Sequence, residues 1–334
     1  MTCIRDEGPY LVEWLSHHLA AGFDHMLVLS HDCTDGSDQL LDMLSVDPRI
    51  THMPFEPAGP KTVQWQALER IKSHELYRNA DWALFFDCDE FLCSPKSVSH
   101  IIDDFSKQTT FDALTLPWRF FGANGQKRRK EGLTPERFKR AAPFDLHFPL
   151  AHLFKTLHRP RSFRQPGVHR PRLKKNSEAI WMHANGQMLP SSFAQSDAAI
   201  TLYGSISHSP KLWLNHYSLR SVEEFLIKRA RGLPNHMARE IDLQYWVERN
   251  WNTVEACEID HMLPSTKRYY DTLLKLPGIE ETHQGCLKAH KERHRVINND
   301  LEALRLSFRL NMVPESRPPT PEEAKHFIQA QLKI

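Results

Sequence analysis

The feature that most constrains the fold is an apolar run that ends in acids: ALFFDCDEF, residues 83–91. An apolar run without polar alternation is typical of a strand covered on both faces in the middle of a parallel sheet. Ligands of open α/β sheets bind beyond the carboxyl ends of such strands, where Asp87, Asp89 and Glu90 would lie. Because adjacent acids repel one another without a cation, this segment predicts a cation-binding site rather than a simple helix cap.

The spacing of Asp87 and Asp89 favours a divalent metal. Side chains two residues apart in an extended segment point to the same side, so both carboxylates can act on one ion. Carboxylate, phosphate and water oxygens suit Mg²⁺ or Mn²⁺, and such an ion lets a diphosphate approach an acidic cleft. We therefore expect Mn²⁺ or Mg²⁺ as a cofactor that stabilises a departing nucleoside diphosphate.

Strands alternate with helices through the first 118 residues. Periodicity and cap signals predict helices over 10–22, 39–45 and 62–79 and from about residue 97. Buried or half-buried strands are predicted over 25–30, 50–55, 82–87 and 111–118. This alternation predicts an α/β fold with a mostly parallel central sheet and right-handed crossovers.

The second half of the chain is less regular. Residues 119–180 read as long loops and short strands, and helix returns near residue 221, with Ser221 as the cap and Glu224 as its capping-box partner. Further on, apolar residues and histidines recur at steps of three and four and predict a narrow helical seam. The seam residues are Leu287, His290, His294, Ile297, Leu301, Leu304 and Phe308. We expect the seam to pack back on the domain rather than to face a second copy or a membrane.

The formal net charge of +2 hides a basic block. Residues 117–175 hold sixteen Lys and Arg against three Asp and Glu, a net charge of +13. Such a block is most often a solvated face, but it can also receive phosphates, an acidic acceptor or an anionic membrane surface. Within it, Lys155, Arg159 and His169 are candidates for donor or acceptor contacts.

Length and composition indicate a globular protein. No uncharged apolar run approaches the roughly 18 residues of a membrane span, and the start, MTCIRDEGPY, lacks a signal-peptide core. Six scattered cysteines favour neither a disulfide framework nor structural zinc. We expect a cytoplasmic protein without a nucleic acid partner and leave open a peripheral contact with an anionic membrane at its inner face.

A D-x-D motif after an apolar strand also occurs in phosphotransferases of the haloacid dehalogenase type, in which the first Asp is the nucleophile. In that class the motif belongs to the first strand and is followed by Thr or Val. Here it lies on about the fourth strand, and Glu90 and Phe91 follow it. This alternative, which requires phosphorylation of Asp87, is therefore less favoured.

Three segments resemble the bacterial family-2-like glycosyltransferases of GT-A fold, the branch whose N-terminus reads K/R-N/D-E-x-x-Y-L-x-E-W. They are RDEGPYLVEWLSHHLAAGFDHMLVLSHDCTDGSDQLLDML, FFDCDEFL and LNHYSLRSVEEFLIKRARG. The similarity covers roughly residues 3–118 and 211–233. It implies a nucleotide-diphospho-sugar donor, with UDP favoured, a divalent metal, and transfer to a hydroxyl of a glycan or glycolipid acceptor.

The resemblance also implies roles for individual residues. The implied nucleotide-sugar-binding residues are Arg5, Asp6, Glu7, Asp32, Asp87, Arg220, Lys228 and Arg231. The implied metal ligands are Asp87, Asp89 and, from LNHY, His216. Solvated or structural positions are the alternative for His216 and for the basic residues after it.

The catalytic base is left unassigned. An inverting transfer needs a carboxylate that takes the proton of the acceptor hydroxyl. Glu90, Glu178 and Asp197 are candidates, whereas Glu224 is better explained as a helix cap. No spacing distinguishes among them, so a non-catalytic descendant that binds a nucleotide sugar or glycan without turnover stays open.

The sequence therefore predicts a metal-dependent, inverting glycosyltransferase of surface or capsular polysaccharide synthesis. Its expected fold is a Rossmann-like GT-A sheet flanked by helices, with a helical C-terminal extension. Residues 1–118 would form the nucleotide-sugar-binding half of the domain, residues 119–233 the acceptor-side half, and residues 234–334 the extension.

Overall fold

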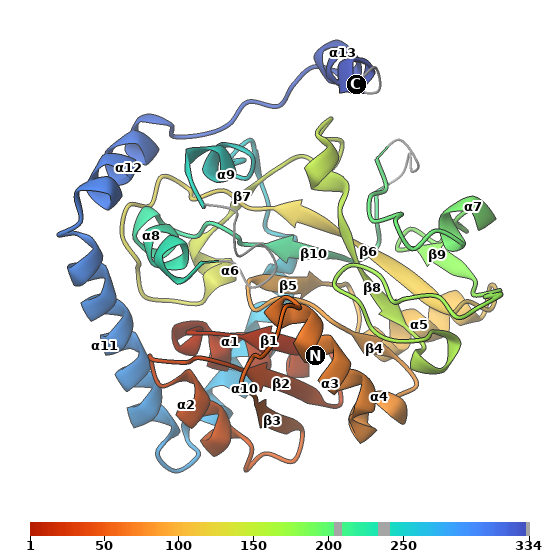
Figure 1. Ribbon diagram of the computed structural model, residues 1–334, viewed down its shortest axis with the longest axis horizontal. Helices are drawn as coiled ribbons and strands as arrows, with labels where there is room; N and C mark the ends of the chain where they lie inside the picture. The colour runs from red at the N-terminus through yellow and green to blue at the C-terminus, as the bar shows by residue number, and fades with distance from the viewer. Residues whose placement is uncertain (204–208, 233–240, 332–334) are drawn as a thin grey trace.

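The computed structural model describes residues 1–203, 209–232 and 241–331, which form a mixed α/β protein with a helical C-terminal region (Figure 1). The smaller sheet has the order β1-β2-β3 and is parallel throughout. Its strands are β1 (Thr2–Ile4), β2 (Met26–Ser30) and β3 (Ile50–Pro54). As predicted, these strands alternate with helices.

The larger sheet is mixed, which corrects the expectation of a mostly parallel central sheet. Its order is β4-β8-β6-β10-β5, with β9 also paired to β6. Only the β6–β10 and β6–β9 pairs are parallel. The strands are β4 (Ala83–Leu84), β5 (Glu90–Cys93), β6 (Ala113–Phe120), β8 (Phe154–His158), β9 (Trp181–His183) and β10 (Trp213–His216). A separate antiparallel pair joins β7 (Arg140–Ala141) to β11 (Val254–Glu255).

The predicted central strand, residues 82–87, forms only the short β4. The amino group of Met1 donates to the Leu84 carbonyl (2.8 Å), and the Phe86 amide donates to the Met1 carbonyl (3.1 Å). These two bonds follow the parallel pattern, whereas β8 pairs antiparallel on the other side. The segment is therefore buried between two neighbours, as predicted, but it joins a parallel sheet to a mixed one.

Helices cover the faces of both sheets (Figure 1). In the first half they are α1 (Gly8–Ala20), α2 (Ser37–Leu44), α3 (Val63–Ser73), α4 (Glu75–Arg78), α5 (Val98–Ser106) and α6 (Thr134–Arg137). In the second half they are α7 (Ser191–Ala194), α8 (Val222–Arg231), α9 (Leu243–Val247), α10 (Leu263–Leu274), α11 (Ile279–Ile297), α12 (Leu301–Met312) and α13 (Pro321–Gln331). The helix predicted over 62–79 is two helices, because His74 is extended and its ring accepts a hydrogen bond from the Leu76 amide at the start of α4.

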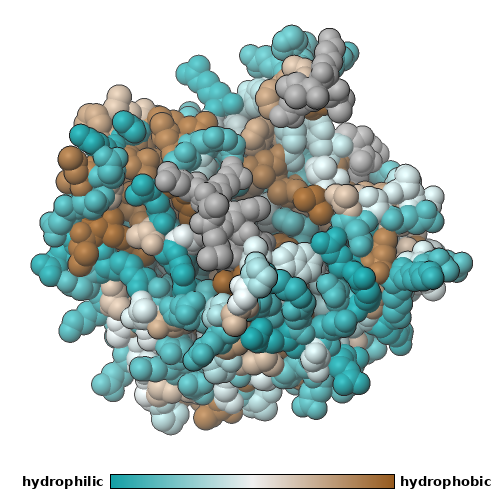
Figure 2. Space-filling model, in the orientation of Figure 1, coloured by the Kyte–Doolittle hydropathy of each residue, from teal (hydrophilic) through white to brown (hydrophobic). Residues whose placement is uncertain are grey.

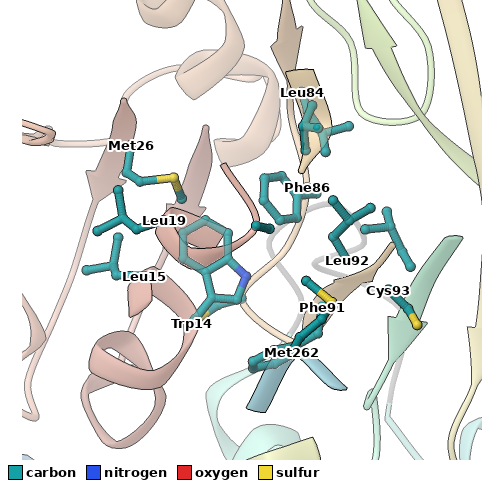
Figure 3. Packing of buried hydrophobic residues seen from close by; sticks show 14 of the residues in the cluster. Trp14, Leu15, Leu19, Met26, Leu84, Phe86, Phe91, Leu92, Cys93 and Met262 are labelled. Carbon is teal, nitrogen blue, oxygen red and sulfur yellow. The ribbon is translucent and has the colours of Figure 1, made fainter. Parts of the chain in front are cut away.

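The largest hydrophobic cluster lies beneath the acidic motif (Figure 3). Trp14 of α1 is fully buried there, with its ring 4.9 Å from that of Phe86. Its indole Nε1 donates to the carbonyls of Asp87 and Glu90, at 3.1 Å each. The core therefore holds the backbone on both sides of the D-x-D turn.

The helices α10 and α11 belong to the same core, since Leu273 and Ile279 are members of the cluster. At Gly8, an added Cβ would meet Cys286 of α11 at 2.6 Å, so the absence of a side chain lets α1 and α11 approach closely. The predicted domain boundary at residues 233 and 234 lies outside the described residues, and the three-part division stays a prediction.

The predicted C-terminal seam is wrong in its second half. The chain breaks after α11, and Asp300 caps α12 by accepting a hydrogen bond from the Ala303 amide (2.7 Å). The break turns a different face inward, so Ala303, Leu306 and Leu310 are buried. The seam residues Leu301, Leu304 and Phe308 are instead 59%, 45% and 69% exposed. Within the described chain, no helix has the length and apolar character needed to cross a membrane.

Candidate active site

A pocket of about 370 Å³ lies where β1, β2, β4, β8 and β10 meet α8. Most of the site residues expected from the sequence line it, although they come from segments far apart in the chain. They are Arg5, Glu7, Asp32, Asp87, Asp89, Lys155, His169, His216, Lys228 and Arg231. The pocket is the candidate site because it combines acids, cations and apolar walls in one concavity.

Asp87 is held by a lysine from β8. The ammonium of Lys155 lies 2.8 Å from one carboxylate oxygen of Asp87, and Gln64 donates to the other at 3.2 Å. Lys155 is fully buried. Burial alone would lower its pKa, but Asp87 and Glu90 raise the pKa above the usual value. Lys155 therefore carries a positive charge at the floor of the pocket.

Asp89 has a second lysine and a histidine as neighbours. Lys228 of α8 lies 2.7 Å from Asp89 Oδ2, and His216 Nε2 lies 3.5 Å from Oδ1. Burial would raise the pKa of Asp89, but Lys228 and His216 hold it well below the usual range. Burial lowers the pKa of His216 despite the opposing effect of Asp89, so its imidazole is neutral near pH 7. The antiparallel pairing of His216 with Glu90 explains why this ring lies beside Asp89.

The end of α8 contacts the loop after β1. Arg231 donates to Glu7 Oε1 at 2.5 Å and to the Arg5 carbonyl at 2.8 Å. Arg5 itself forms no ion pair with the described residues, and burial together with the charge of Arg231 lowers the pKa of its guanidinium. The capping box of Ser221 and Glu224, which begins α8, is confirmed.

Three of the predicted site residues have a left-handed backbone. The φ angles are +54° at Asp6, +46° at Asp32 and +56° at Arg220. Non-glycine residues adopt this conformation at a cost, and such positions concentrate at functional sites. Asp6 lies just outside the pocket, where it binds the Thr34 amide (2.7 Å) and Arg293 of α11 (2.9 Å). Asp32 lines the pocket with a largely exposed carboxylate.

Arg220 and Glu90 lie behind the pocket rather than in it. The Arg220 guanidinium stacks 3.5 Å from the centre of the Tyr10 ring and donates to the Cys88 carbonyl at 3.3 Å. Glu90 is fully buried and accepts a hydrogen bond from the Asp87 amide (3.0 Å), while burial raises its pKa well above the usual value. Both residues support the D-x-D turn, and Glu90 has no access to an acceptor.

The structure does not bring three further candidates to the pocket. Glu178 is exposed on a distant loop. Asp197 lies outside the pocket and accepts a hydrogen bond from the Leu173 amide (3.0 Å). Arg159 stacks on Trp82 at 4.4 Å and donates to the Phe111 carbonyl. Glu178 and Asp197 are therefore poorly placed for an acceptor base, and Arg159 for a donor contact. His169 does line the pocket, and burial lowers its pKa to about 4.

Sequence reasoning missed several residues of the pocket wall. Gln64, Trp118, Tyr245 and Arg249 all line it. Gln64 sits on the predicted helix 62–79 but carries no motif, and Tyr245 and Arg249 come from an irregular region without a recognisable pattern. The only signal for these residues in the sequence is their polar or aromatic character.

The side chains that line the pocket include ligand types that suit a hard divalent cation. Two carboxylates and a neutral imidazole face one pocket, and His216 Nδ1 is buried without a hydrogen-bond partner among the described residues. In the described chain, however, no three His, Cys, Asp or Glu side chains are gathered closely enough to hold an ion. Lys155 and Lys228 instead neutralise Asp87 and Asp89.

A comparison with protein families identifies the family of this chain. The model of glycosyltransferase family 92 matches residues 5–203, which is 199 of the 334 residues. The chain belongs to glycosyltransferase family 92. This enzyme is thus a glycosyltransferase, as expected, but the matching family is family 92 rather than the family-2-like branch. No curated protein matches the sequence.

The matched region contains only part of the glycosyltransferase pocket. It includes the loop after β1, the D-x-D motif and Lys155. His216, Lys228 and Arg231 lie beyond residue 203, yet they complete the same pocket. The segment from β10 through α8 therefore contributes to this site although the family match ends before it.

Proposed function

We propose that this glycosyltransferase transfers a sugar from a nucleotide-diphospho-sugar, with UDP favoured, to a hydroxyl of a glycan or glycolipid. One observation carries the proposal: the D-x-D carboxylates, the cations of α8 and Arg5 in the loop after β1 line the same pocket. We also propose that the transfer is inverting and serves surface or capsular polysaccharide synthesis, as the resemblance to family-2-like enzymes implies.

The cations of the pocket suit a diphosphate. Arg5 has no ion pair among the described residues, and Arg231 and Lys228 lie on the same helix one turn apart. Guanidinium groups bind phosphate oxygens through paired hydrogen bonds, and an ammonium adds a point charge. These three residues would bind the diphosphate and stabilise the charge that develops as the nucleotide leaves. Asp32, with its exposed carboxylate, would contact the nucleoside.

We propose that Mn²⁺ or Mg²⁺ binds with the donor, held by Asp87, Asp89 and His216. When bound, such an ion supplies Lewis-acid stabilisation of the nucleoside diphosphate. The neutral imidazole of His216 and its unpartnered Nδ1 support this assignment. Lys155 and Lys228 pair with the two carboxylates before the donor arrives. The acceptor base is not assigned to any of the pocket carboxylates.

We further propose that the two sheets together represent a GT-A fold. The parallel order β1-β2-β3, the backbone bonds of Met1 to residues 84 and 86, and the acids directly after β4 support this interpretation. The alternative of a haloacid dehalogenase-type phosphotransferase is disfavoured by family membership. The other alternative, a non-catalytic descendant, would bind the same ligands as the proposed enzyme but would not transfer the sugar.

The proposal is tested by thermal unfolding with a panel of UDP-, GDP-, CMP- and dTDP-sugars, each with Mn²⁺ or with EDTA. A ligand that binds only the folded state stabilises it, by about 2.7 kcal/mol at one hundred times its Kd. We expect one nucleotide class to raise Tm by several degrees, and more with Mn²⁺ than with EDTA. No shift with any donor would contradict the proposal.

A matched pair of variants ties the shift to the pocket. Arg231→Lys keeps the charge beside Glu7 but loses the paired hydrogen bonds, so the donor-induced shift should fall. Arg295→Lys is the control, because Arg295 pairs with Glu292 on the exposed face of α11. An equal loss in both variants would show that Arg231 does not contact the donor. Release of free nucleotide from the bound donor then separates the enzyme from a non-catalytic descendant.

A further inference from the structure

The helix α12 presents an apolar face to solvent. Of the large apolar side chains that are exposed in the described chain, five fall within 17 consecutive residues. They are Val296 (60% exposed), Leu301 (59%), Leu304 (45%), Phe308 (69%) and Met312 (67%). Hydrophobic residues gather at the upper left of Figure 2, where Figure 1 shows α12. A cluster of this kind is unusual on a soluble surface and marks an interaction site.

The face is continuous because of its helical spacing. Positions 301, 304, 308 and 312 recur at three and four residues, which places them on one side of α12. Leu306 and Leu310 point the other way, into a cluster with Phe225 of α8 and Trp246 of α9, and Ala303 is also buried. The helix is therefore anchored to the protein by one side while the opposite side stays uncovered.

Basic residues surround the apolar face. Residues 127–131 and 291–312 together hold nine Lys and Arg against four Asp and Glu, a net charge of +5, although Arg129 and Arg293 face Glu224 and Asp6 instead. The loop of Lys127 is fixed beside α8, because the Glu223 amide donates to the Lys127 carbonyl (3.0 Å). His294 of α11 approaches the same Glu223 at 3.9 Å. The basic loop thus lies next to the end of α11, where α12 follows.

We propose that the apolar face of α12 docks on an anionic lipid bilayer. An amphipathic helix that lies in the membrane interface inserts apolar side chains, and the basic residues around it attract anionic headgroups. Arg305 and Arg309 are exposed on α12 itself, beside the apolar residues. This surface accounts for only one part of the basic block, residues 127–130, and the docking does not depend on the proposed function.

A second copy of the chain is a less suitable occupant. The helix α12 has twelve residues and is only about 18 Å long. One face of so short a helix is smaller than the roughly 800 Å² that a stable interface buries on each partner. In a two-fold dimer the same surface meets itself, so the positive charges of both copies would face one another. A bilayer needs no such area from one helix and offers the opposite charge.

The test is co-sedimentation of the full chain with vesicles of equimolar phosphatidylglycerol and phosphatidylcholine, and with phosphatidylcholine alone. We expect binding to the anionic vesicles that weakens as NaCl rises from about 0.1 to 1 M, because salt screens exposed charges. Phe308→Ser should weaken it roughly tenfold by removing the most exposed aromatic anchor. Arg305→Gln combined with Arg309→Gln should reduce both the affinity and its salt dependence.

Val46→Ser is the matched control, because Val46 is 72% exposed and lies outside this surface. It should leave vesicle binding unchanged. Thermal unfolding of each variant checks that the fold is intact. We expect it to be, because the replaced side chains are exposed. The proposal is overturned if anionic vesicles do not bind the protein, or if Phe308→Ser binds as tightly as Val46→Ser. It is also overturned if the protein is a dimer in sedimentation velocity that Phe308→Ser dissociates.

Discussion

Buried charges around the pocket are balanced by partners from distant segments. Asp87 pairs with Lys155, 68 residues later, and Asp89 pairs with Lys228, 139 residues later. A buried charge costs free energy unless it is paired and hydrogen-bonded. In the proposed function, a diphosphate or metal would therefore replace existing charged partners rather than enter an apolar cavity.

Glu224 shows how such a balance depends on pH. Burial alone would raise the pKa of its carboxyl, but Arg137, whose guanidinium contacts both carboxylate oxygens, lowers the pKa to about 2. A carboxyl with a lowered folded-state pKa stabilises the protein above its usual pKa of 4.5, and this stability is lost as pH falls toward 2. The stabilisation at pH 7 is about 3 kcal/mol.

We therefore expect Glu224→Gln to unfold more easily at pH 7 and to approach the wild-type stability as pH falls from 4.5 toward 2. Urea unfolding at several pH values measures this difference. Glu302→Gln, on the exposed face of α12, is the control and should follow the wild type throughout. A constant difference between Glu224→Gln and the wild type over the whole pH range would refute the assignment.

At the residue scale, the sequence predicted those site residues that a local pattern marks. Asp87 and Asp89 follow an apolar run, and His216 and Lys228 belong to one quoted motif. The partner of each could not be predicted, because pairs such as Asp87 and Lys155 form only when two strands, here β4 and β8, meet. Gln64 and Tyr245 were missed for the same reason.

Among the elements, α1 has the clearest influence on the site. Its Trp14 donates to the Asp87 and Glu90 carbonyls and fills the core beneath them (Figure 3). Both carbonyls flank the D-x-D turn, so this indole fixes the backbone from which the two carboxylates project. The helix was predicted from its apolar spacing, but the hydrogen bonds of Trp14 required the structure.

Replacing Trp14 by Phe should therefore lower the free energy of unfolding by more than the loss of side-chain volume alone would. Trp181→Phe is the matched control, because Trp181 is equally buried but its indole nitrogen has no hydrogen-bond partner among the described residues. Loss of the single indole N–H of Trp14, which is shared between the two carbonyls, adds about 0.5–1.5 kcal/mol of destabilisation over the control in urea unfolding. Donor binding should also weaken in Trp14→Phe only. Equal effects in both variants would contradict a role of the indole in holding the turn.

Element prediction failed where a pattern continued across a break. The seam from Leu287 to Phe308 has a single period in the sequence, yet Asp300 caps a new helix within it. Because α12 starts anew after this break, the side chains of α12 that pack on α8 are not those that continue the apolar repeat of α11. Likewise, the prediction of a mostly parallel central sheet failed because β8 returns beside β4 and β6 in the antiparallel direction, which no local signal specifies.

Over the whole molecule, the pocket depends on both halves of the chain. The segments after β1 and β4 supply the acids, and β10 and α8 supply His216, Lys228 and Arg231. The helix α11 adds Arg293, which holds Asp6 at the edge of the site. Because these contacts are long-range, the α/β class could be predicted from the sequence but the assembled pocket could not.

The central claim is that this pocket binds a nucleoside diphosphate and a metal together. The most direct measurement is a crystal structure with UDP and Mn²⁺, with anomalous scattering used to locate manganese. We predict an anomalous peak beside Asp89 and His216, with diphosphate density against Lys228 and Arg231. Nucleotide density outside this pocket, or nucleotide bound here with manganese elsewhere, would contradict the account.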